Sequence, residues 1–231
     1  MIGFYDYTVI LTYLSLVSAG CGIMVALSGG GHPYIGTFFL LFCGLCDAFD
    51  GKVARTKKDR SQTECSFGVQ IDSLSDLVAF GVLPAAIGSA MLRRSALMHA
   101  VYGTPWEKSI GVGVTAILIL YILAAMIRLA WYNVTEEERQ KTESGVRKYY
   151  TGLPVTSAAL IFPFILLLQY VIPADLTPMY FAAAVFCAAA FLSPVQIRKP
   201  GLKGVLILVG IGAVEFLLLL ALILVRKFLI R

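Results

Sequence analysis

The sequence predicts an all-α integral membrane protein, a bundle of about six to eight transmembrane helices. Of the 231 residues, 58% are hydrophobic and only 14% are charged, and the mean hydropathy is +0.82. A soluble domain of this size does not need so much apolar surface. The apolar residues form runs near the length of about 20 that crosses a bilayer as a helix, whereas a transmembrane barrel would show short alternating segments. We therefore expect a single transmembrane domain over residues 1–231.

Seven apolar segments can be marked along the chain. They cover residues 8–28, 34–54, 70–92, 109–133, 152–173, 178–194 and 204–225. Glycine- and proline-rich runs separate them, such as GGGHP at 29–33 and RKPG at 198–201, because these residues end helices and form turns. The sixth segment is short for a membrane span. We expect the C-terminal helices of residues 174–231 to lie at the periphery of the domain.

Lysine and arginine indicate the orientation, because short cytoplasmic loops carry an excess of both. With a cytoplasmic N-terminus, the loops after the second, fourth and sixth segments are the basic ones. They hold Arg55, Lys57, Lys58 and Arg60, then Arg139, Lys141, Arg147 and Lys148, then Arg198, Lys199 and Lys203. We therefore expect a multi-pass protein of the cell membrane in which the second and third segments meet at the cytoplasmic face.

The net charge of +5 does not indicate a nucleic-acid partner. A nucleic-acid interface would need a basic stripe with interleaved aromatic residues, which the sequence lacks. Basic residues at one face of a membrane protein follow more simply from topology and from contact with anionic lipid head groups. Membrane lipids are therefore the expected partners.

Four aspartates are concentrated between residues 47 and 76, and their spacing places them on two helix faces. The first face carries Asp47, Asp50, Gly51 and Ala54, and the second carries Gly68, Asp72 and Asp76. Two facing helices would bring the four carboxylates into one pocket, where the glycines let a ligand approach the backbone. Ionised carboxylates so close together repel one another, and one or two divalent cations relieve this repulsion, because Mg2+, Mn2+ and Ca2+ prefer oxygen ligands. Paired metals also serve phosphoryl displacement.

A simpler alternative is that these acids face water and pair with neighbouring basic side chains. The available partners are Lys52, Arg55, Lys57 and Lys58. This alternative explains neither the shared helix faces nor the glycines.

The pattern of these residues resembles the signature of the CDP-alcohol phosphatidyltransferase family. It reads Asp47-x2-Asp50-Gly51-x2-Ala54-Arg55 and then Gly68-x3-Asp72-x3-Asp76. Twelve residues separate the arginine from the second glycine, which is more than in the family's common pattern, and we interpret the excess as an insertion in a cytoplasmic loop. The runs FGVLP at 80–84, RLAWYN at 128–133 and GLP at 152–154 resemble the phosphatidylserine synthase branch. The resemblance covers roughly residues 6–165.

The resemblance implies transfer of a phosphatidyl group from CDP-diacylglycerol to a small alcohol, with L-serine as the expected acceptor and phosphatidylserine and CMP as products. It implies Mg2+ or Mn2+ as cofactor, with Ca2+ as a further candidate ion, and a homodimer. The implied metal ligands are Asp47, Asp50, Asp72 and Asp76, of which Asp76 also takes the hydroxyl proton. The implied CDP and diphosphate contacts are Thr12, Asp50, Gly51, Ala54, Arg55 and Gly68. For Thr12, a hydroxyl bonded to its own helix carbonyl is an equal alternative.

The expected acceptor site is formed by Arg128, Asn133, Arg147 and Lys148. A buried guanidinium needs an anionic partner, and arginine binds a carboxylate such as that of serine in a forked geometry. Pairing of Arg128 with an acid or a lipid phosphate is an equal alternative, and Arg147 and Lys148 also fit solvated loop residues. Glycerol 3-phosphate and inositol phosphate are the alternative acceptors.

A cation transporter is the alternative from another functional class, because acids within a membrane mark ion pathways. The position of the aspartates near one face and the lack of an internal repeat argue against it. Glu215 lies inside the last apolar segment, where either a partner on another helix or a neutral, protonated state would accommodate it.

Overall fold

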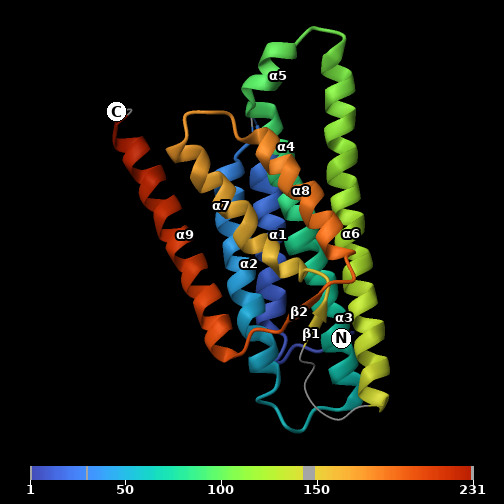
Figure 1. The fold of residues 1–231 in the computed structure, drawn as a ribbon. Helices are drawn as coiled ribbons and strands as arrows, with labels where there is room; N and C mark the ends of the chain where they lie inside the picture. Colours follow the sequence, from blue (N-terminus) through green and yellow to red (C-terminus); the bar gives the residue numbers. More distant parts are fainter. Residues whose placement is uncertain (1, 30, 143–148, 230–231) are drawn as a thin grey trace.

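The computed structural model describes residues 2–29, 31–142 and 149–229, which form a bundle of long helices (Figure 1). The helices are α1 (Ile10–Leu27), α2 (Pro33–Ala54), α3 (Gln62–Asp76), the π-helix η1 (Leu77–Val82), α4 (Leu83–Arg94), α5 (Ala96–Val101), α6 (Trp106–Thr142), the 3-10 helix η2 (Val155–Ser157), α7 (Ala158–Val171), α8 (Thr177–Phe191) and α9 (Leu202–Leu229). Two short strands, β1 (Tyr149–Thr151) and β2 (Gln196–Arg198), pair antiparallel.

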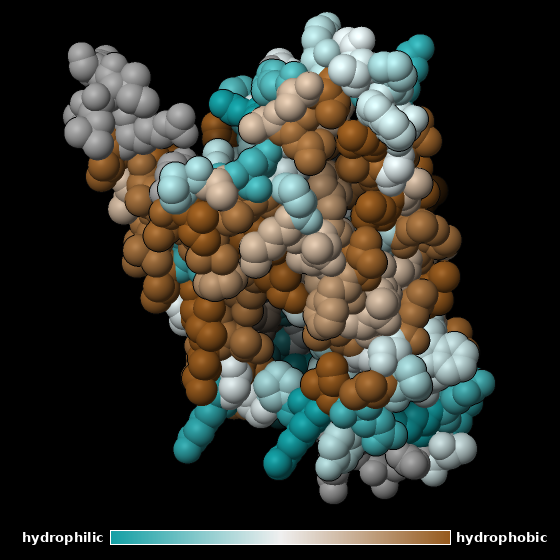
Figure 2. All heavy atoms as spheres, turned by 45° about the horizontal axis from the view of Figure 1, so that its top comes forward, coloured by the Kyte–Doolittle hydropathy of each residue, from teal (hydrophilic) through white to brown (hydrophobic). Residues whose placement is uncertain are grey.

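Within the described residues, five helical stretches are long and apolar enough to cross a membrane: α1, α2, the continuous helix Gln62–Arg94, α6, and α9 over Leu202–Val225. The helices of Val155–Gln169 and Thr177–Phe191 are apolar but shorter. Figure 2 shows apolar side chains over the middle of the visible face and hydrophilic ones gathered toward its ends. Each of the seven predicted segments corresponds to a helix, and the predicted all-α membrane protein is confirmed.

The core contains large aromatic side chains from helices that are far apart in the sequence. Tyr121 of α6, Phe162 of α7 and Tyr180 of α8 are each at most 1% exposed. The rings of Tyr121 and Phe162 meet edge to face, with centroids 5.6 Å apart. The expectation that α8 is peripheral is wrong, because Tyr180, Ala184 and Cys187 of this helix are buried in the main core. The last helix, α9, lies on the outside of the bundle and leans away from the other helices at its C-terminal end (Figure 1).

The helix that runs from α3 to α4 changes its geometry directly after Asp76. In η1 the hydrogen bonds lengthen by one residue, so that the N–H of Leu83 donates to the carbonyl of Val78. Pro84 has no N–H, so the carbonyl of Phe80, four residues earlier, loses its α-helical donor. The Tyr121 hydroxyl of α6 donates to that carbonyl oxygen at 2.5 Å. The π turn is therefore tied to the core by a side chain of another helix.

The strand pair anchors the connection into α7 against the end of α8. Gly152, directly after β1, has a φ of +76°, and its N–H donates to the carbonyl of Val195 at 2.8 Å. A Cβ at this position would lie 2.6 Å from the carbonyl oxygen of Phe191. Both the positive φ and the close approach require glycine.

Candidate active site

Three aspartates converge where the last turns of α2 approach α3. Asp47, Asp50 and Asp72 each place a carboxylate oxygen within 4.8 Å of the others. Asp47 and Asp50 lie on one face of α2, and Asp72 comes from α3. A cluster of oxygen donors with this separation fits a hard divalent cation. The structure thus brings together three of the four predicted acids in a geometry suited to Mg2+, Mn2+ or Ca2+.

The fourth acid, Asp76, lies one helical turn beyond Asp72, at the end of α3. Its side chain is buried, at 8% exposure, and it is not part of the three-carboxylate cluster. It is close enough for repulsion from Asp47, Asp72 and Asp50 to act on its carboxylate. Asp76 is therefore a buried carboxylate beside the three-aspartate cluster, and the π turn begins directly after it.

Two of the basic residues near the cluster, Lys52 and Lys57, contact other groups. Within the described ranges, no lysine or arginine forms an ion pair with any of the four aspartates. Lys57 contacts Asp6 and Glu64 instead, and Lys52 lies over the ring of Phe49, 5.0 Å from its centroid. The simpler alternative, in which the acids pair with neighbouring basic side chains, is therefore not what this structure shows.

Lys57 connects the N-terminal segment to the start of α3. Its Nζ lies 2.6 Å from Oδ2 of Asp6 and 2.7 Å from Oε1 of Glu64. Hydrogen bonds from Lys57 and Thr8 lower the pKa of Asp6 to about 2, and the same contact raises the pKa of Lys57. Glu64 and Ser61 form a capping box, each accepting the backbone N–H of the other, at 2.7 and 3.1 Å, which begins α3.

The twelve residues between Arg55 and Gly68 are not all loop. Because α3 begins at Gln62, the second half of this stretch is helical, and the connecting loop covers only residues 56–61. The predicted insertion therefore includes a short loop and the first turns of α3. This helix begins at Gln62, well before the expected start near residue 70.

Arg60 lies in this loop and was not selected from the sequence. Its Nη2 lies 2.7 Å from the position that a Cβ on Gly68 would take and donates to the carbonyl of Glu64 at 3.2 Å. The Nε atom is buried without a hydrogen-bond partner among the described residues. Gly68, expected to leave room for cytidine, is therefore covered by a guanidinium. The only signal in the sequence is a basic residue within the inserted stretch.

The other predicted diphosphate contacts cluster at the C-terminal end of α2. The N–H of Gly51 donates to the carboxylate of Asp50. The Arg55 guanidinium lies over Gly51, where a Cβ would be 3.4 Å from Nη1. Ala54 is the last residue of α2 and is half-buried. An exposed arginine and a glycine thus stand together beside Asp50.

Thr12 of α1 lies next to the acids through its backbone. It is buried, and its carbonyl accepts a hydrogen bond from Oγ of Ser75 at 3.1 Å. Ser75 directly precedes Asp76, so this contact fixes α1 against the acidic end of α3.

Two of the predicted acceptor residues, Arg128 and Asn133, lie five residues apart on α6. Arg128 is buried, and its Cζ lies 5.3 Å from the ring centroid of Tyr132. Nδ2 of Asn133 donates to Oγ of Ser73 at 2.7 Å, directly beside Asp72. The other two predicted residues, Arg147 and Lys148, lie outside the described residues.

Glu215 lies away from this site, on α9. It is buried, and its Oε2 has no hydrogen-bond partner within the part of the chain that the structure describes. Its helix packs on α2 and α7, through contacts such as that between Phe38 and Phe216, whose ring centroids are 5.0 Å apart.

Comparison with known families places this geometry in context. The sequence profile of the CDP-alcohol phosphatidyltransferase family matches residues 8–195. The chain belongs to the CDP-alcohol phosphatidyltransferase family. The matched range contains all four aspartates and ends before α9. The resemblance deduced from the aspartate signature is confirmed.

Several relatives in this phosphatidyltransferase family have names that specify a reaction. The CDP-diacylglycerol–serine O-phosphatidyltransferase of Saccharomyces cerevisiae is 34% identical over 163 residues, which are 68% of this chain and 51% of that protein. The protein of the same name from Helicobacter pylori is 28% identical over 64% of this chain and 53% of its own length. Archaetidylserine synthase of Methanothermobacter thermautotrophicus is 30% identical over 64% of this chain and 53% of its own length. The chain thus spans about half the length of these relatives.

Proposed function

We propose that this chain transfers a phosphatidyl group from CDP-diacylglycerol to L-serine, giving phosphatidylserine and CMP. The observation that carries the proposal is the cluster of Asp47, Asp50 and Asp72, with Asp76 buried beside it. Membership of the family supports the transfer from a CDP-linked donor. Serine as the acceptor is supported by the names of the relatives.

In this proposal, Asp47, Asp50 and Asp72 would hold one or two divalent metals, Mg2+ or Mn2+, and Asp76 would complete the second site. Metal ions bound there would neutralise the diphosphate and stabilise the charge that develops on the CMP leaving group. Asp76 accepts the proton of the serine hydroxyl while the serine oxygen bonds to the phosphorus of the phosphatidyl group. The bond between that phosphorus and the bridging oxygen of CMP breaks, and CMP leaves.

Arginines bind the oxygens of the diphosphate. Arg55 extends from the end of α2 over Gly51, and Arg60 lies across Gly68 with a buried Nε that lacks a partner among the described residues. A guanidinium binds phosphate oxygens in a bidentate geometry. Cytidine occupies the space beside Gly51, Ala54 and Gly68, Thr12 contacts the nucleotide, and Arg60 moves from Gly68 toward the diphosphate as the donor binds.

Arg128 and Asn133 hold the acceptor. Arg128 is the buried cation of α6 and takes the carboxylate of serine, and Asn133 stands between α6 and the acidic face of α3. Arg147 and Lys148 are assigned to the same acceptor from the sequence alone. Glycerol 3-phosphate and inositol phosphate are the alternative acceptors, and these basic residues would then bind their phosphate.

We assign the aspartate end of the bundle to the cytoplasmic face of the plasma membrane, because the loop between α2 and α3 holds Arg55, Lys57, Lys58 and Arg60 and such loops are rich in basic residues. A homodimer is proposed by analogy with the family.

Release of CMP by the purified protein in detergent, with CDP-diacylglycerol and Mg2+ or Mn2+, tests the proposal. L-serine, glycerol 3-phosphate and inositol phosphate are supplied separately. Asp76→Asn should abolish release, whereas Asp59→Asn, at an exposed aspartate of the α2–α3 loop, is the matched control and should retain it. Release only with another acceptor refutes serine. Failure with every acceptor, in folded protein that binds metal, refutes the transfer, and cation flux through liposomes without CDP-lipid would then favour a transporter.

A further inference from the structure

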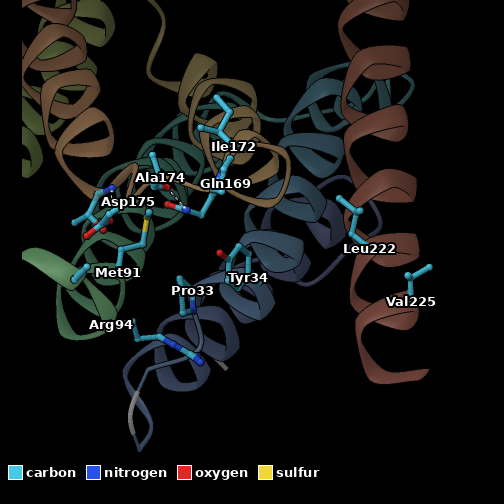
Figure 3. A pocket seen from close by; sticks show the side chains of 13 residues that line it. Pro33, Tyr34, Met91, Arg94, Gln169, Ile172, Ala174, Asp175, Leu222 and Val225 are labelled. Carbon is cyan, nitrogen blue, oxygen red and sulfur yellow. Dashed lines mark hydrogen bonds between the residues drawn. The ribbon is translucent and has the colours of Figure 1, made fainter. Parts of the chain in front are cut away.

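A cavity of about 730 Å³ (Figure 3) lies at the start of α2, whereas Asp47 and Asp50 lie near the end of that helix. It is bordered by the start of α2, the ends of α4 and α7, and α9. Tyr34, which lines it, precedes Asp47 by thirteen residues of the same helix, or roughly 20 Å at 1.5 Å per residue. The cavity is therefore separate from the candidate active site.

The walls of the cavity are mostly apolar. Leu222 and Val225 of α9 stand on one side, and Tyr34 and Ile172 stand across the open space from them (Figure 3). Toward the aspartates the gap closes at Leu219, which is fully buried in a cluster between α9, α2 and α7. An apolar recess between helices with a few polar groups at one end is the usual form of a small-ligand site.

A cation stands at the polar end of the cavity. Arg94, the last residue of α4, lines it and donates from Nη1 to the carbonyl of Gly31 at 2.8 Å. Among the described residues, no carboxylate lies within 4.0 Å of this guanidinium. Its charge is therefore available to an anion that enters the cavity.

An anion stands at the same end. Asp175, in the turn between α7 and α8, accepts hydrogen bonds from Oγ of Ser95 at 2.6 Å and from the N–H of Thr177 at 2.9 Å. Partial burial favours the neutral acid, but hydrogen bonds from Ser95, Thr177 and Leu97 outweigh it and lower the pKa of Asp175 to about 2. Asp175 is thus ionised at neutral pH, and its hydrogen bonds come from neutral groups.

We propose that this cavity binds one phospholipid whose head group carries both a phosphate and a cationic amine. Arg94 holds the phosphate, Asp175 holds the amine, and one acyl chain lies between Leu222 of α9 and Tyr34 of α2. A head group with a phosphate but no amine would bring a second negative charge toward Asp175, and this repulsion gives selectivity. The lipid comes from the leaflet at the end of the bundle opposite the aspartates.

Native mass spectrometry of the full chain in detergent tests the proposal, with phosphatidylethanolamine or phosphatidylglycerol of identical acyl chains added. The wild-type protein should retain phosphatidylethanolamine over phosphatidylglycerol by roughly fivefold, the effect of about one charge contact. Arg94→Gln should lose both lipids, whereas Asp175→Asn should retain both equally. Arg93→Gln is the matched control, because Arg93 donates to the carbonyl of Leu27 at 3.3 Å and does not line the cavity, and this variant should behave as wild type.

Leu222→Trp provides an independent test, because it fills the apolar wall without changing a charge and should displace the lipid. Equal retention of phosphatidylethanolamine by the wild type, Arg94→Gln and Leu222→Trp would overturn the proposal and assign the lipid to the general membrane surface. A lipid-free dimer that is lost in Leu222→Trp would also overturn it, since a second copy of the chain would then occupy the cavity. Neither readout requires catalysis, so the proposed reaction and this site are tested separately.

Discussion

Removal of one hydroxyl from the core tests how the π turn after Asp76 is held. Tyr121→Phe keeps the aromatic ring, which packs on Phe162 and Phe191, and removes only the donor to the carbonyl of Phe80. The α-helical donor for that carbonyl would be Pro84, which has no N–H. In the variant, the buried carbonyl of Phe80 therefore has neither the Tyr121 hydroxyl nor an N–H of residue 84 as a donor.

We expect Tyr121→Phe to lower the free energy of unfolding by about 1–3 kcal/mol, the cost of leaving a buried polar group unsatisfied. Tyr180→Phe is the matched comparison. The Tyr180 hydroxyl of α8 donates at 2.6 Å to the carbonyl of Pro84, which lies four residues after Phe80 in the helix that runs from α3 to α4. That carbonyl lies in α4, where the N–H of Gly88 is its α-helical donor. We therefore expect Tyr180→Phe to lose only a net hydrogen bond, about 0.5–1.5 kcal/mol, and Tyr121→Phe to lose clearly more.

Equilibrium unfolding in mixed micelles, followed by the fluorescence of Trp106 and Trp131, measures both losses. In the same preparations, Tyr121→Phe should lower CMP release more than Tyr180→Phe does. The π turn that Tyr121 holds begins directly after Asp76, whereas Pro84, the partner of Tyr180, lies beyond that turn. Equal losses of stability in the two variants, or a loss confined to Tyr180→Phe, would refute the view that Tyr121 replaces a missing backbone donor.

Three further substitutions test other features. Gly152→Ala should lower the free energy of unfolding by at least about 2 kcal/mol, because a positive φ and a backbone clash add together; unchanged unfolding would contradict the close approach. Gly68→Ala meets only the flexible end of Arg60, so we expect a change in stability below about 0.5 kcal/mol but a raised KM for CDP-diacylglycerol in the CMP assay. For Asp6, the pKa falls from 3.8 to about 2 on folding, so its stabilising contact with Lys57 is present above pH 3.8 and is lost as the pH falls toward 2. The difference in unfolding midpoint between wild type and Asp6→Asn should thus stay constant from about pH 8 to 5 and disappear near pH 2; a difference that changes near neutral pH would contradict this assignment.

The parts of the site that depend on local spacing could be predicted from the sequence. The helical periodicity of Asp47 and Asp50, and of Asp72 and Asp76, predicts which faces carry acids, and one short loop suffices to bring the two faces together. The position of Arg60 against Gly68 could not be predicted, because it depends on where the capping box begins α3 within the inserted stretch.

The features that depend on tertiary contacts were also missed. No local pattern indicates the π turn, since a run such as LVAFGVLP fits an ordinary helix with one proline. The place of α8 in the core was predicted wrongly, because an apolar helix in a membrane protein has no polar face to show which side is buried. Tyr180 and Cys187 are as compatible with lipid as with a protein interior.

The unequal lengths of the helices have a consequence for the surrounding bilayer. At 1.5 Å per residue, the 15 residues of α8 span about 22 Å and the 37 residues of α6 about 55 Å, against a hydrocarbon thickness of about 30 Å. Lipids beside α8 must shorten to cover it, whereas α6 must tilt or stand out into water. The protein therefore presents a hydrophobic belt of uneven height, and a thicker membrane would impose its mismatch energy mainly on the side of α7 and α8. Its orientation in the bilayer should therefore depend on the acyl-chain length of the host membrane.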